Sequence, residues 1–267
     1  MKSNLQPIKL FLILGLSCTS LLVSETSSLG GGFSDRSHSK MVLAQTPPSD
    51  KEPVPPRGNP GGRVRGGATR GDKTCPAAKP DLTAIVPYTE EADGVVNVWA
   101  QTTLERPSWF FYVPYTKNVA YAVEFVLQDN TDSTEIYRTT IAPPDKPGVI
   151  RVSLPNTVPA LPVNKEYRWF FSINCDPEKN APWTYVEGVI QRVNLNQSTA
   201  KELENADPLK RYAIYAQKGL VYEALATLAE LQQKNPKDTA VQTQWQNLVT
   251  SIRLDDVAKE PLLFDKP

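Results

Sequence analysis

The sequence contains very little histidine and cysteine, and it carries no net charge. His38 is the only histidine in 267 residues, and it lies before the region with the pattern of a folded domain. A Ser/His/Asp or Cys/His nucleophile system and a histidine-based zinc site are therefore excluded from that region. Lys and Arg together number 29, as do Asp and Glu, so the formal net charge is +0. Overall charge gives no support for nucleic-acid binding.

Only one long apolar run occurs, and it lies near the N-terminus. The stretch LFLILGLSCTSLLV at 10–23 is short and rich in Ser and Thr for a membrane-spanning helix. We interpret 1–44 as a secretory signal region, cleaved after VLA before Gln45, or earlier near Ser24. A lipoprotein signal would instead use Cys18, and an uncleaved run would remain as an N-terminal anchor. Export to the periplasm or the exterior is predicted.

Two cysteines, Cys75 and Cys175, remain beyond the signal region. Two cysteines in an oxidising compartment favour one disulfide; the alternative is two separate thiols. A bridge closing a loop of about a hundred residues stabilises a fold by up to roughly 4.7 kcal/mol in the loop-entropy model. We predict a structural disulfide and no catalytic residue.

Residues 45–73 are dense in Pro and Gly, with almost no apolar side chain larger than Val. Such a segment cannot bury enough surface to offset its chain entropy, so a disordered linker is predicted. Its second half is locally basic through Arg57, Arg63, Arg65, Arg70 and Lys73. The composition is typical of a solvated spacer; the alternative is peripheral association with anionic lipid or polysaccharide.

Residues 74–196 predict an antiparallel β-sandwich. Eight short β-rich runs, separated by Pro, Gly, Asn and Asp, begin at Leu82, Val95, Trp109, Val119, Thr134, Val149, Tyr167 and Tyr185. Nothing between them is long and periodic enough for a crossover helix, which argues against a parallel sheet. The stretch LPVNKEYRW from Leu161 resembles the tyrosine corner of immunoglobulin-like and fibronectin type III sandwiches.

The aromatic residues of these runs are predicted to be mostly core. In YRWFFSINC at 167–175 the odd-numbered residues share an apolar face and the even-numbered ones a mixed face. The same alternation in 119–128 places Tyr121 with the inward set. The run WFFYV is apolar on both faces, which predicts a central strand or one covered by a further element. Phe110 and Tyr112 are the side chains that such an element would cover.

Residues 197–254 have helical periodicity and predict a cap of about three helices, followed by a tail at 255–267. Thr199 and Glu202 fit a capping box at a helix start. Asp207, followed by a proline, fits an N-cap with Pro at the first helical position. The predicted fold class is thus mainly β with an α-helical C-terminus.

One pair of these helices is predicted to be tetratricopeptide-like. The segment YAQKGLVYEALATLAELQQKNP resembles a single unit of that repeat, with Gly219 at the turn between its helices. One unit cannot form a solenoid. We therefore interpret the helices as an appendage packed on the sandwich and covering the face of Phe110 and Tyr112.

Seven motifs follow one another in the chain: RGNPGGRVRGGATRGDKTCPA, PSWFFYVPY, AVEFVLQD, PGVIRVSLP, EYRWFFSINCDPEKN, VEGVIQRV and YAQKGLVYEALATLAEL. In this order, from Arg57 to near Ile252, they resemble an exported cyanobacterial family, domain of unknown function 928. The resemblance implies export and a shared fold. It implies no established activity.

A carboxylate pair is the remaining catalytic hypothesis. Glycoside hydrolysis needs two acids on a β scaffold, and Glu124 and Glu187 each interrupt a largely apolar strand. The alternative, which we favour, is that both point outward on mixed faces. No metal is predicted, because QDNTDST at 128–134 lacks the later acidic ligand of a calcium loop. No cofactor is predicted, because no Gly-rich phosphate loop follows a strand.

These observations favour a noncatalytic function, as an exported binding or scaffolding module of the cell envelope. Its expected partner is another protein, and nucleic acid is not expected. One alternative is a carbohydrate-binding module, with Trp99 and Trp183 as the exposed rings that stack on sugars. The other is a carboxylate-dependent hydrolase that uses Glu124 and Glu187.

Overall fold

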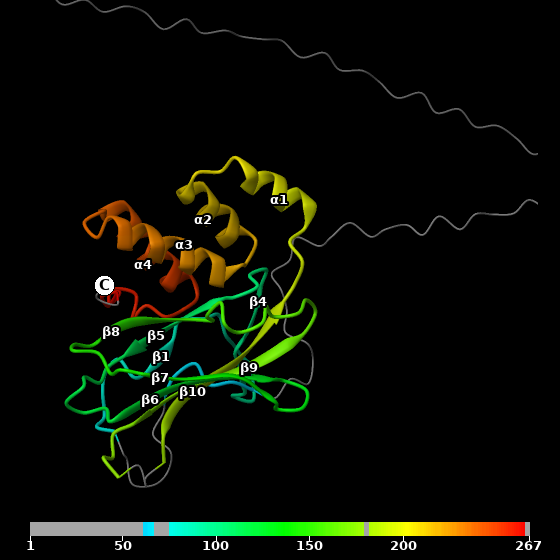
Figure 1. Cartoon of the computed structure of the whole chain (residues 1–267). Helices are drawn as coiled ribbons and strands as arrows, with labels where there is room; N and C mark the ends of the chain where they lie inside the picture. Colours follow the sequence, from blue (N-terminus) through cyan, green and yellow to red (C-terminus); the bar gives the residue numbers. More distant parts are fainter. Residues whose placement is uncertain (1–60, 67–74, 179–181, 265–267) are drawn as a thin grey trace, which may run out of the picture. The chain divides into compact units, whose positions relative to one another are not determined.

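The computed structural model describes residues 61–66, 75–178 and 182–264. The strands are β1 (Thr83–Ala84), β2 (Thr89–Glu90), β3 (Val96–Asn97), β4 (Trp99–Thr102), β5 (Ser108–Val113), β6 (Ala122–Asp129), β7 (Glu135–Ile141), β8 (Gly148–Ser153), β9 (Glu166–Asn174) and β10 (Thr184–Arg192). The helices are α1 (Gln197–Glu204), α2 (Pro208–Gln217), α3 (Val221–Lys234) and α4 (Thr239–Ser251). The described chain is mainly β with a helical C-terminal part, as predicted, but it has four helices rather than about three (Figure 1).

The predicted signal region, 1–44, and the predicted linker at 45–73, apart from residues 61–66, lie outside these ranges. Within the described ranges, no helix combines the length and apolarity needed to cross a membrane.

The strands form a five-stranded sheet, a three-stranded sheet and a small two-stranded one. The five-stranded sheet has the order β4-β10-β9-β6-β7, and the three-stranded sheet has the order β1-β5-β8. All of these pairs are antiparallel except β4 with β10, which is parallel. Each of the eight predicted runs contains strand residues.

Aromatic rings join the inner faces of the two larger sheets. Phe111 of β5 stacks on Phe171 of β9 with ring centroids 4.1 Å apart, and it lies 5.7 Å from Trp169. Trp109 lies 4.8 Å from Phe125 of β6. All five side chains are fully buried. The prediction that these aromatic runs are core is confirmed, and the two sheets face each other across them.

The period-two alternation predicted for β9 is also confirmed. Tyr167, Trp169, Phe171 and Ile173 are buried, whereas Arg168 and Phe170 are partly exposed. The prediction is wrong for Tyr121, which is 55% exposed. The reason is that β6 begins only at Ala122, so Tyr121 precedes the strand that would have turned it inward.

The segment 61–66 joins the two larger sheets at one edge. Arg63 and Glu187 of β10 exchange two backbone hydrogen bonds, each of 2.9 Å. On the other side, the Ala84 amide of β1 donates to the Val64 carbonyl at 2.9 Å. A Cβ on Gly62 would lie 2.6 Å from Val98 Cβ, so only glycine fits this close approach. For these six residues the prediction of a disordered linker is wrong, because two strand edges satisfy their backbone groups.

Helices cover the outer face of the three-stranded sheet (Figure 1). Trp245 of α4 packs edge-on against Phe110 of β5, with ring centroids 5.5 Å apart. Burial raises the pKa of Tyr112, and the nearby Glu260 and Asp256 raise it further. The helices and the residues after them therefore cover Phe110 and Tyr112, as the two-sided apolar pattern of β5 predicted.

The predicted tail at 255–267 is folded up to residue 264. Val257 is fully buried. The Val149 amide of β8 donates to the Pro261 carbonyl at 2.8 Å, and the Leu263 amide donates to the Val149 carbonyl at 2.7 Å. The residues after α4 thus pair with the edge of β8 instead of forming a separate tail.

Local capping chemistry sets the starts of the first two helices. Asp207 caps α2 by accepting the Lys210 amide at 3.0 Å, as predicted. The predicted capping box at Thr199 is wrong by one turn. Asn196 caps α1 and accepts the Thr199 amide at 2.8 Å. Gly219 has a φ of +69° between α2 and α3, a backbone conformation that favours glycine.

Candidate functional site

The outer face of the five-stranded sheet carries most of the side chains that the sequence singled out for chemistry. We call this surface the open face. It is made by Trp99, Glu124, Val126, Arg138, Arg168, Phe170, Tyr185 and Glu187, whose side chains alternate with core residues. The helices pack instead on β4 and β5 (Figure 1).

The strand register builds the centre of the open face from four strands. Phe170 of β9 pairs with Glu187 of β10 on one side and with Val126 of β6 on the other. Val126 pairs in turn with Arg138 of β7. Cross-strand partners lie on the same side of a sheet, so two apolar side chains lie between an acid and a base.

Two half-buried aromatic rings lie on this surface. Phe170 is one, and Tyr185, two residues before Glu187 on β10, is the other. The guanidinium of Arg63 lies 4.8 Å from the centroid of the Tyr185 ring, a cation–π contact. The segment 61–66 therefore contributes a side chain to the open face.

Arg168 connects the segment 61–66 to the middle of the open face. Its Nη1 lies 3.2 Å from Glu187 Oε2 and donates to the Gly61 carbonyl at 3.4 Å. Its Nε donates to Asn130 Oδ1 at 3.2 Å. Both members of the Arg168–Glu187 pair are mostly buried, so solvent screens the pair less than it screens a surface pair.

Arg138 holds two acids at the β7 side of the open face. It forms ion pairs with Glu124 and Glu135. Hydrogen bonding to Glu135 raises the pKa of Arg138, burial opposes this increase, and the charges of Glu124 and Glu135 raise the pKa further. The arginine is 48% exposed, which leaves this cluster in contact with solvent. Ion pairs this exposed contribute little to stability, typically about 0–1 kcal/mol.

The open face does not assemble Glu124 and Glu187 into a pair of catalytic acids. Glu124 pairs with Ser172, and Glu187 pairs with Phe170, on opposite sides of β9. The strand spacing of about 4.8 Å separates their backbones by roughly 10 Å across the sheet, in addition to a two-residue offset along it. Each carboxylate is bound by its own arginine. Both acids lie on mixed faces, as the noncatalytic alternative expected.

Trp99 is not an exposed stacking residue. It is 8% exposed, and its indole N–H donates to Glu166 Oε1 at 3.3 Å. The expectation of an exposed ring is wrong for this residue, which pairs with the buried Val189 of β10 and bonds to Glu166 of β9. Trp183, immediately before β10, is half-buried. Phe170 and Tyr185 are the aromatic residues that sequence reasoning did not propose, although alternation had placed Phe170 on the mixed face.

A buried acid at the contact of α3 with β4 also escaped sequence reasoning. Glu223 is 2% exposed. Its Oε1 accepts the Thr103 amide at 2.5 Å and the hydroxyls of Thr102 and Thr103 at 3.0 and 2.9 Å. Burial raises the pKa of Glu223, and the hydrogen bonds from Thr103 and Thr102 oppose the increase. The feature of the sequence that could have indicated it is the position of Glu223 between apolar residues in the helical run VYEALATLAEL.

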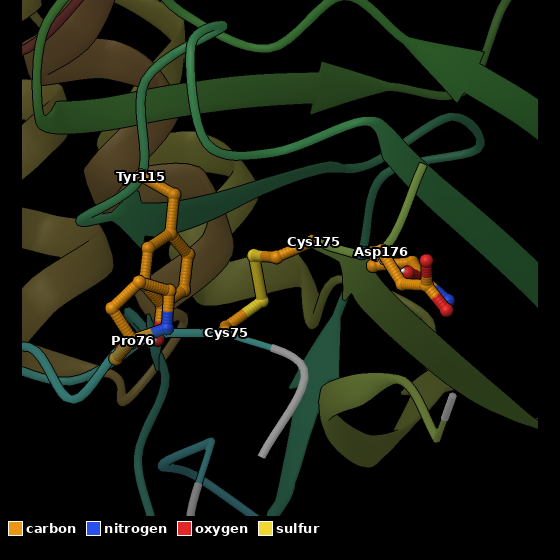
Figure 2. Close-up of a disulfide and its surroundings, with 6 residues drawn as sticks. Cys75, Pro76, Tyr115, Cys175 and Asp176 are labelled. Atoms are coloured by element: carbon orange, nitrogen blue, oxygen red, sulfur yellow. Dashed lines mark hydrogen bonds between the residues drawn. A yellow bond between two sulfur atoms is a disulfide. The ribbon is translucent and has the colours of Figure 1, made fainter. Parts of the chain in front are cut away.

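The predicted disulfide is present between Cys75 and Cys175, at a sequence separation of 100 residues (Figure 2). It ties the chain that follows the segment 61–66 to the end of β9. Beside it, the Tyr115 hydroxyl donates to the Pro76 carbonyl at 3.0 Å (Figure 2). Within the described residues, no cluster of three or more His, Cys, Asp or Glu side chains is arranged to hold a metal ion.

A protein-family model matches most of the chain. The model of a family described as Domain of Unknown Function (DUF928) matches residues 65–262. This range covers both larger sheets, all four helices and the residues that pair with β8. A search of curated proteins gives no match.

Proposed function

The chain belongs to the DUF928 family, and from this premise we propose that it is a noncatalytic binding or scaffolding module of the cell envelope, with the open face as its binding surface. We also propose that the two larger sheets form an immunoglobulin- or fibronectin III-like sandwich. In the same proposal, α2 and α3 form a tetratricopeptide-like pair.

A difference between the two outer faces carries this proposal. The outer face of the three-stranded sheet is covered by helices, and its aromatic ring, Phe110, is fully buried against Trp245 of α4. The open face keeps Phe170 and Tyr185 partly accessible between arginines and glutamates. A solvated sheet face needs no partly exposed aromatic rings for folding, so these rings support a role in recognition.

The composition of the open face supports a polypeptide as its partner. Aromatic residues and arginine are enriched at the centres of protein interfaces, where they carry most of the binding energy. Arg168 is held by Glu187, Asn130 and the Gly61 carbonyl, so its side chain is already ordered before a partner arrives. Preorganised side chains lower the entropic cost of association.

Export is the proposed setting of this function. The apolar run at 10–23 supports a secretory signal, and the pairing of Cys75 with Cys175 is consistent with an oxidising compartment. We place the protein in the periplasm or outside the cell. The basic residues of 45–73 would allow peripheral contact with anionic lipid or polysaccharide.

Carbohydrate binding is the second candidate. Trp183 and Tyr185 are half-buried, one before and one within β10, and rings of this kind stack on sugar faces. The burial of Trp99 weakens this reading, because it removes one of the two stacking residues that the sequence suggested. The positions of Glu124 and Glu187 do not support the hydrolase hypothesis, because the two acids lie on opposite sides of β9.

Photo-crosslinking in cells tests the proposal. The full chain would carry p-benzoylphenylalanine in place of Phe170, with a matched variant in place of Leu209, which is 42% exposed on α2. We expect a protease-sensitive adduct with an envelope protein from position 170 and none from position 209. A protease-resistant, glycan-containing adduct would select the carbohydrate candidate. Equal labelling from both positions would contradict any specific role of the open face.

A further inference from the structure

The open face carries its side chains in rows that cross the strands. The row at its centre, which we call the central row, consists of Glu187 of β10, Phe170 of β9, Val126 of β6 and Arg138 of β7. Each member pairs with the next in the strand register, so all four lie on one side of the sheet. The row therefore has an acid at one end, a base at the other and two apolar side chains between them.

The central row is complementary to itself under a two-fold rotation. An axis parallel to the strands, between β9 and β6, places β10 of one copy over β7 of a second copy and β9 over β6. Glu187 then faces Arg138 of the second copy, and Phe170 faces Val126. The rotation repeats both contacts, as in the isologous interface of a two-fold dimer.

The neighbouring row fits the same rotation. It consists of Tyr185, Ser172, Glu124 and Thr140, again from β10 to β7. The axis between β9 and β6 places Ser172 opposite Glu124 of the second copy, where the hydroxyl can donate to the carboxylate. An axis that crosses the strands along the central row would instead place Glu187 on Glu187 and Arg138 on Arg138. Like charges that face each other destabilise an interface, so charge selects the axis parallel to the strands.

The charged ends of the central row are ordered and can each accept a further partner. Arg138 pairs with Glu124 and Glu135 of its own chain and is exposed, and its guanidinium has five N–H donors. Glu187 is held by Arg168 through Oε2 and is partly exposed. Two ordered groups of opposite charge lose little conformational entropy when they meet across an interface.

The area of the open face fits a weak dimer. At a strand spacing of about 4.8 Å, the four strands β10, β9, β6 and β7 are roughly 19 Å wide. The 8 residues of β6 extend about 27 Å at roughly 3.4 Å per residue. Two such faces together cover about 1,000 Å², the lower limit for a specific protein interface. The strand β4 lies beyond β10, and its Trp99 is already buried without a second copy.

We propose that the open face binds a second copy of this chain in a two-fold dimer, in which Glu187 of each copy pairs with Arg138 of the other. The inference rests on the proposed function, because it identifies the partner of the same surface. The two five-stranded sheets would pack face to face with their strands aligned, as in a sheet-on-sheet contact. The self-complementary order of charges in the central row carries the proposal.

Sedimentation velocity of the full chain over a concentration series tests the proposal. We expect a reversible monomer–dimer equilibrium for the wild type. Arg138→Glu should raise the dissociation constant about tenfold or more, because two opposite-charge contacts become like-charge contacts. The matched control is Lys117→Glu, which makes the same charge change in an exposed ion pair with Asp145, outside the open face. A wild type that stays monomeric, or equal weakening by both variants, would overturn the proposal.

Mixing two charge variants tests the predicted pair of residues. Glu187→Lys and Arg138→Glu should each dimerise poorly alone, because like charges then face each other at both contacts. In the mixture, one copy contributes two positive side chains and the other two negative ones, so we expect a mixed dimer at least severalfold tighter than either variant alone. A mixture that associates no better than its components would contradict the contact between Glu187 and Arg138.

Photo-crosslinking between isotopically light and heavy copies tests the orientation without a charge variant. p-Benzoylphenylalanine would replace Phe170, with Tyr121, which is 55% exposed and precedes β6, as the control position. We expect light–heavy adducts from position 170 to the β6 peptide that contains Val126, and none from position 121. Light–heavy adducts from position 170 to β9 instead would overturn the axis. An intact disulfide by mass and an unchanged circular dichroism spectrum verify folding of every variant.

The outcomes distinguish this inference from the proposed function. Capture of a different envelope protein at position 170, with a wild type that stays monomeric, overturns the inference and leaves the proposed function standing. Light–heavy adducts to β6 support both. Adducts neither to a second copy nor to any other protein would overturn both. A glycan adduct without light–heavy adducts overturns the inference in favour of the carbohydrate candidate.

Discussion

The outer faces of the two larger sheets meet different environments, although both carry aromatic residues. Phe110 on the three-stranded sheet is fully buried beneath Trp245. Phe170 on the five-stranded sheet is half-buried, and its cross-strand partners are Val126 and Glu187. One aromatic residue is thus part of the core, while the other remains partly exposed on the sheet surface.

This difference separates residues kept for folding from residues free to serve recognition. A face covered by helices must be apolar, because burying an unpaired polar group costs free energy. Among the described residues, the Arg151–Glu230 ion pair joins β8 to α3, and Glu223 of α3 accepts three hydrogen bonds at Oε1. The open face has no such constraint, so its charged and aromatic side chains need another explanation, for which we propose binding.

Replacing Phe110 with alanine should have the largest effect on stability. Truncating a fully buried phenylalanine removes its packing and leaves a cavity, so we expect a loss of about 3–5 kcal/mol in the free energy of unfolding. Urea denaturation measures this loss. A double-mutant cycle with Trp245→Ala should give a coupling of about 0.5–1.5 kcal/mol. Additive effects would mean that α4 does not hold this face.

Replacing both Cys75 and Cys175 with serine should rank second. Loss of a native disulfide from a small domain costs about 2–5 kcal/mol. The bridge ties the chain after 61–66 to the end of β9. In urea denaturation of the double-serine variant, we therefore expect both sheets to unfold in one transition at a lower urea concentration. Two separated transitions, followed by tryptophan fluorescence and circular dichroism, would show that the covered and open sheets unfold independently.

Glu223→Gln should change how stability depends on pH, with a smaller effect than the two changes above. The pKa of Glu223 in the folded protein lies above its ordinary value of 4.5, so folding favours the protonated acid. That contribution is fully present below the unfolded pKa and is lost as pH rises through the folded pKa. The wild-type stability relative to Glu223→Gln should therefore fall from pH 4 to pH 8 in urea titrations. A constant or rising difference would contradict this.

Phe170→Ala should have the smallest effect on stability, about 1 kcal/mol or less, since the ring is only half-buried. It should nevertheless reduce partner capture more than any of the stability variants that remain folded. Quantitative pull-down from an envelope fraction, beside thermal denaturation of the same variant, measures both effects. A loss of stability comparable to that of Phe110→Ala would remove the distinction between the two faces.

Local patterns were sufficient for the strands, the aromatic core and the cover over β5. Alternation in 167–175 identified Trp169 and Phe171 as core, and two-sided apolarity in β5 predicted a covering element over Phe110. These predictions succeed because burial on one or both faces requires apolar side chains at period two or continuously. The Cys75–Cys175 pair likewise followed from the cysteine count and the predicted export.

Contacts between distant segments escaped the sequence because their partners come from far along the chain. The segment 61–66 has the composition of a Pro/Gly linker, but its backbone bonds to β1 and β10. Trp99 looks like an exposed ring, but Glu166 and the neighbouring strands bury it. The side-chain periodicity and composition of a segment indicate which of its residues can be buried. They do not indicate which other strand the segment pairs with.

The amino-acid order by itself therefore determined the mainly β domain with helices after it, the inward aromatic residues and the cysteine pair. Only the tertiary structure decided that residues 61–66 join two sheets, that Glu124 and Glu187 stay apart, and that Phe170 and Tyr185 share one surface. The physical reason is range. Side-chain alternation is a local property, whereas strand order and register arise from the packing of the whole chain.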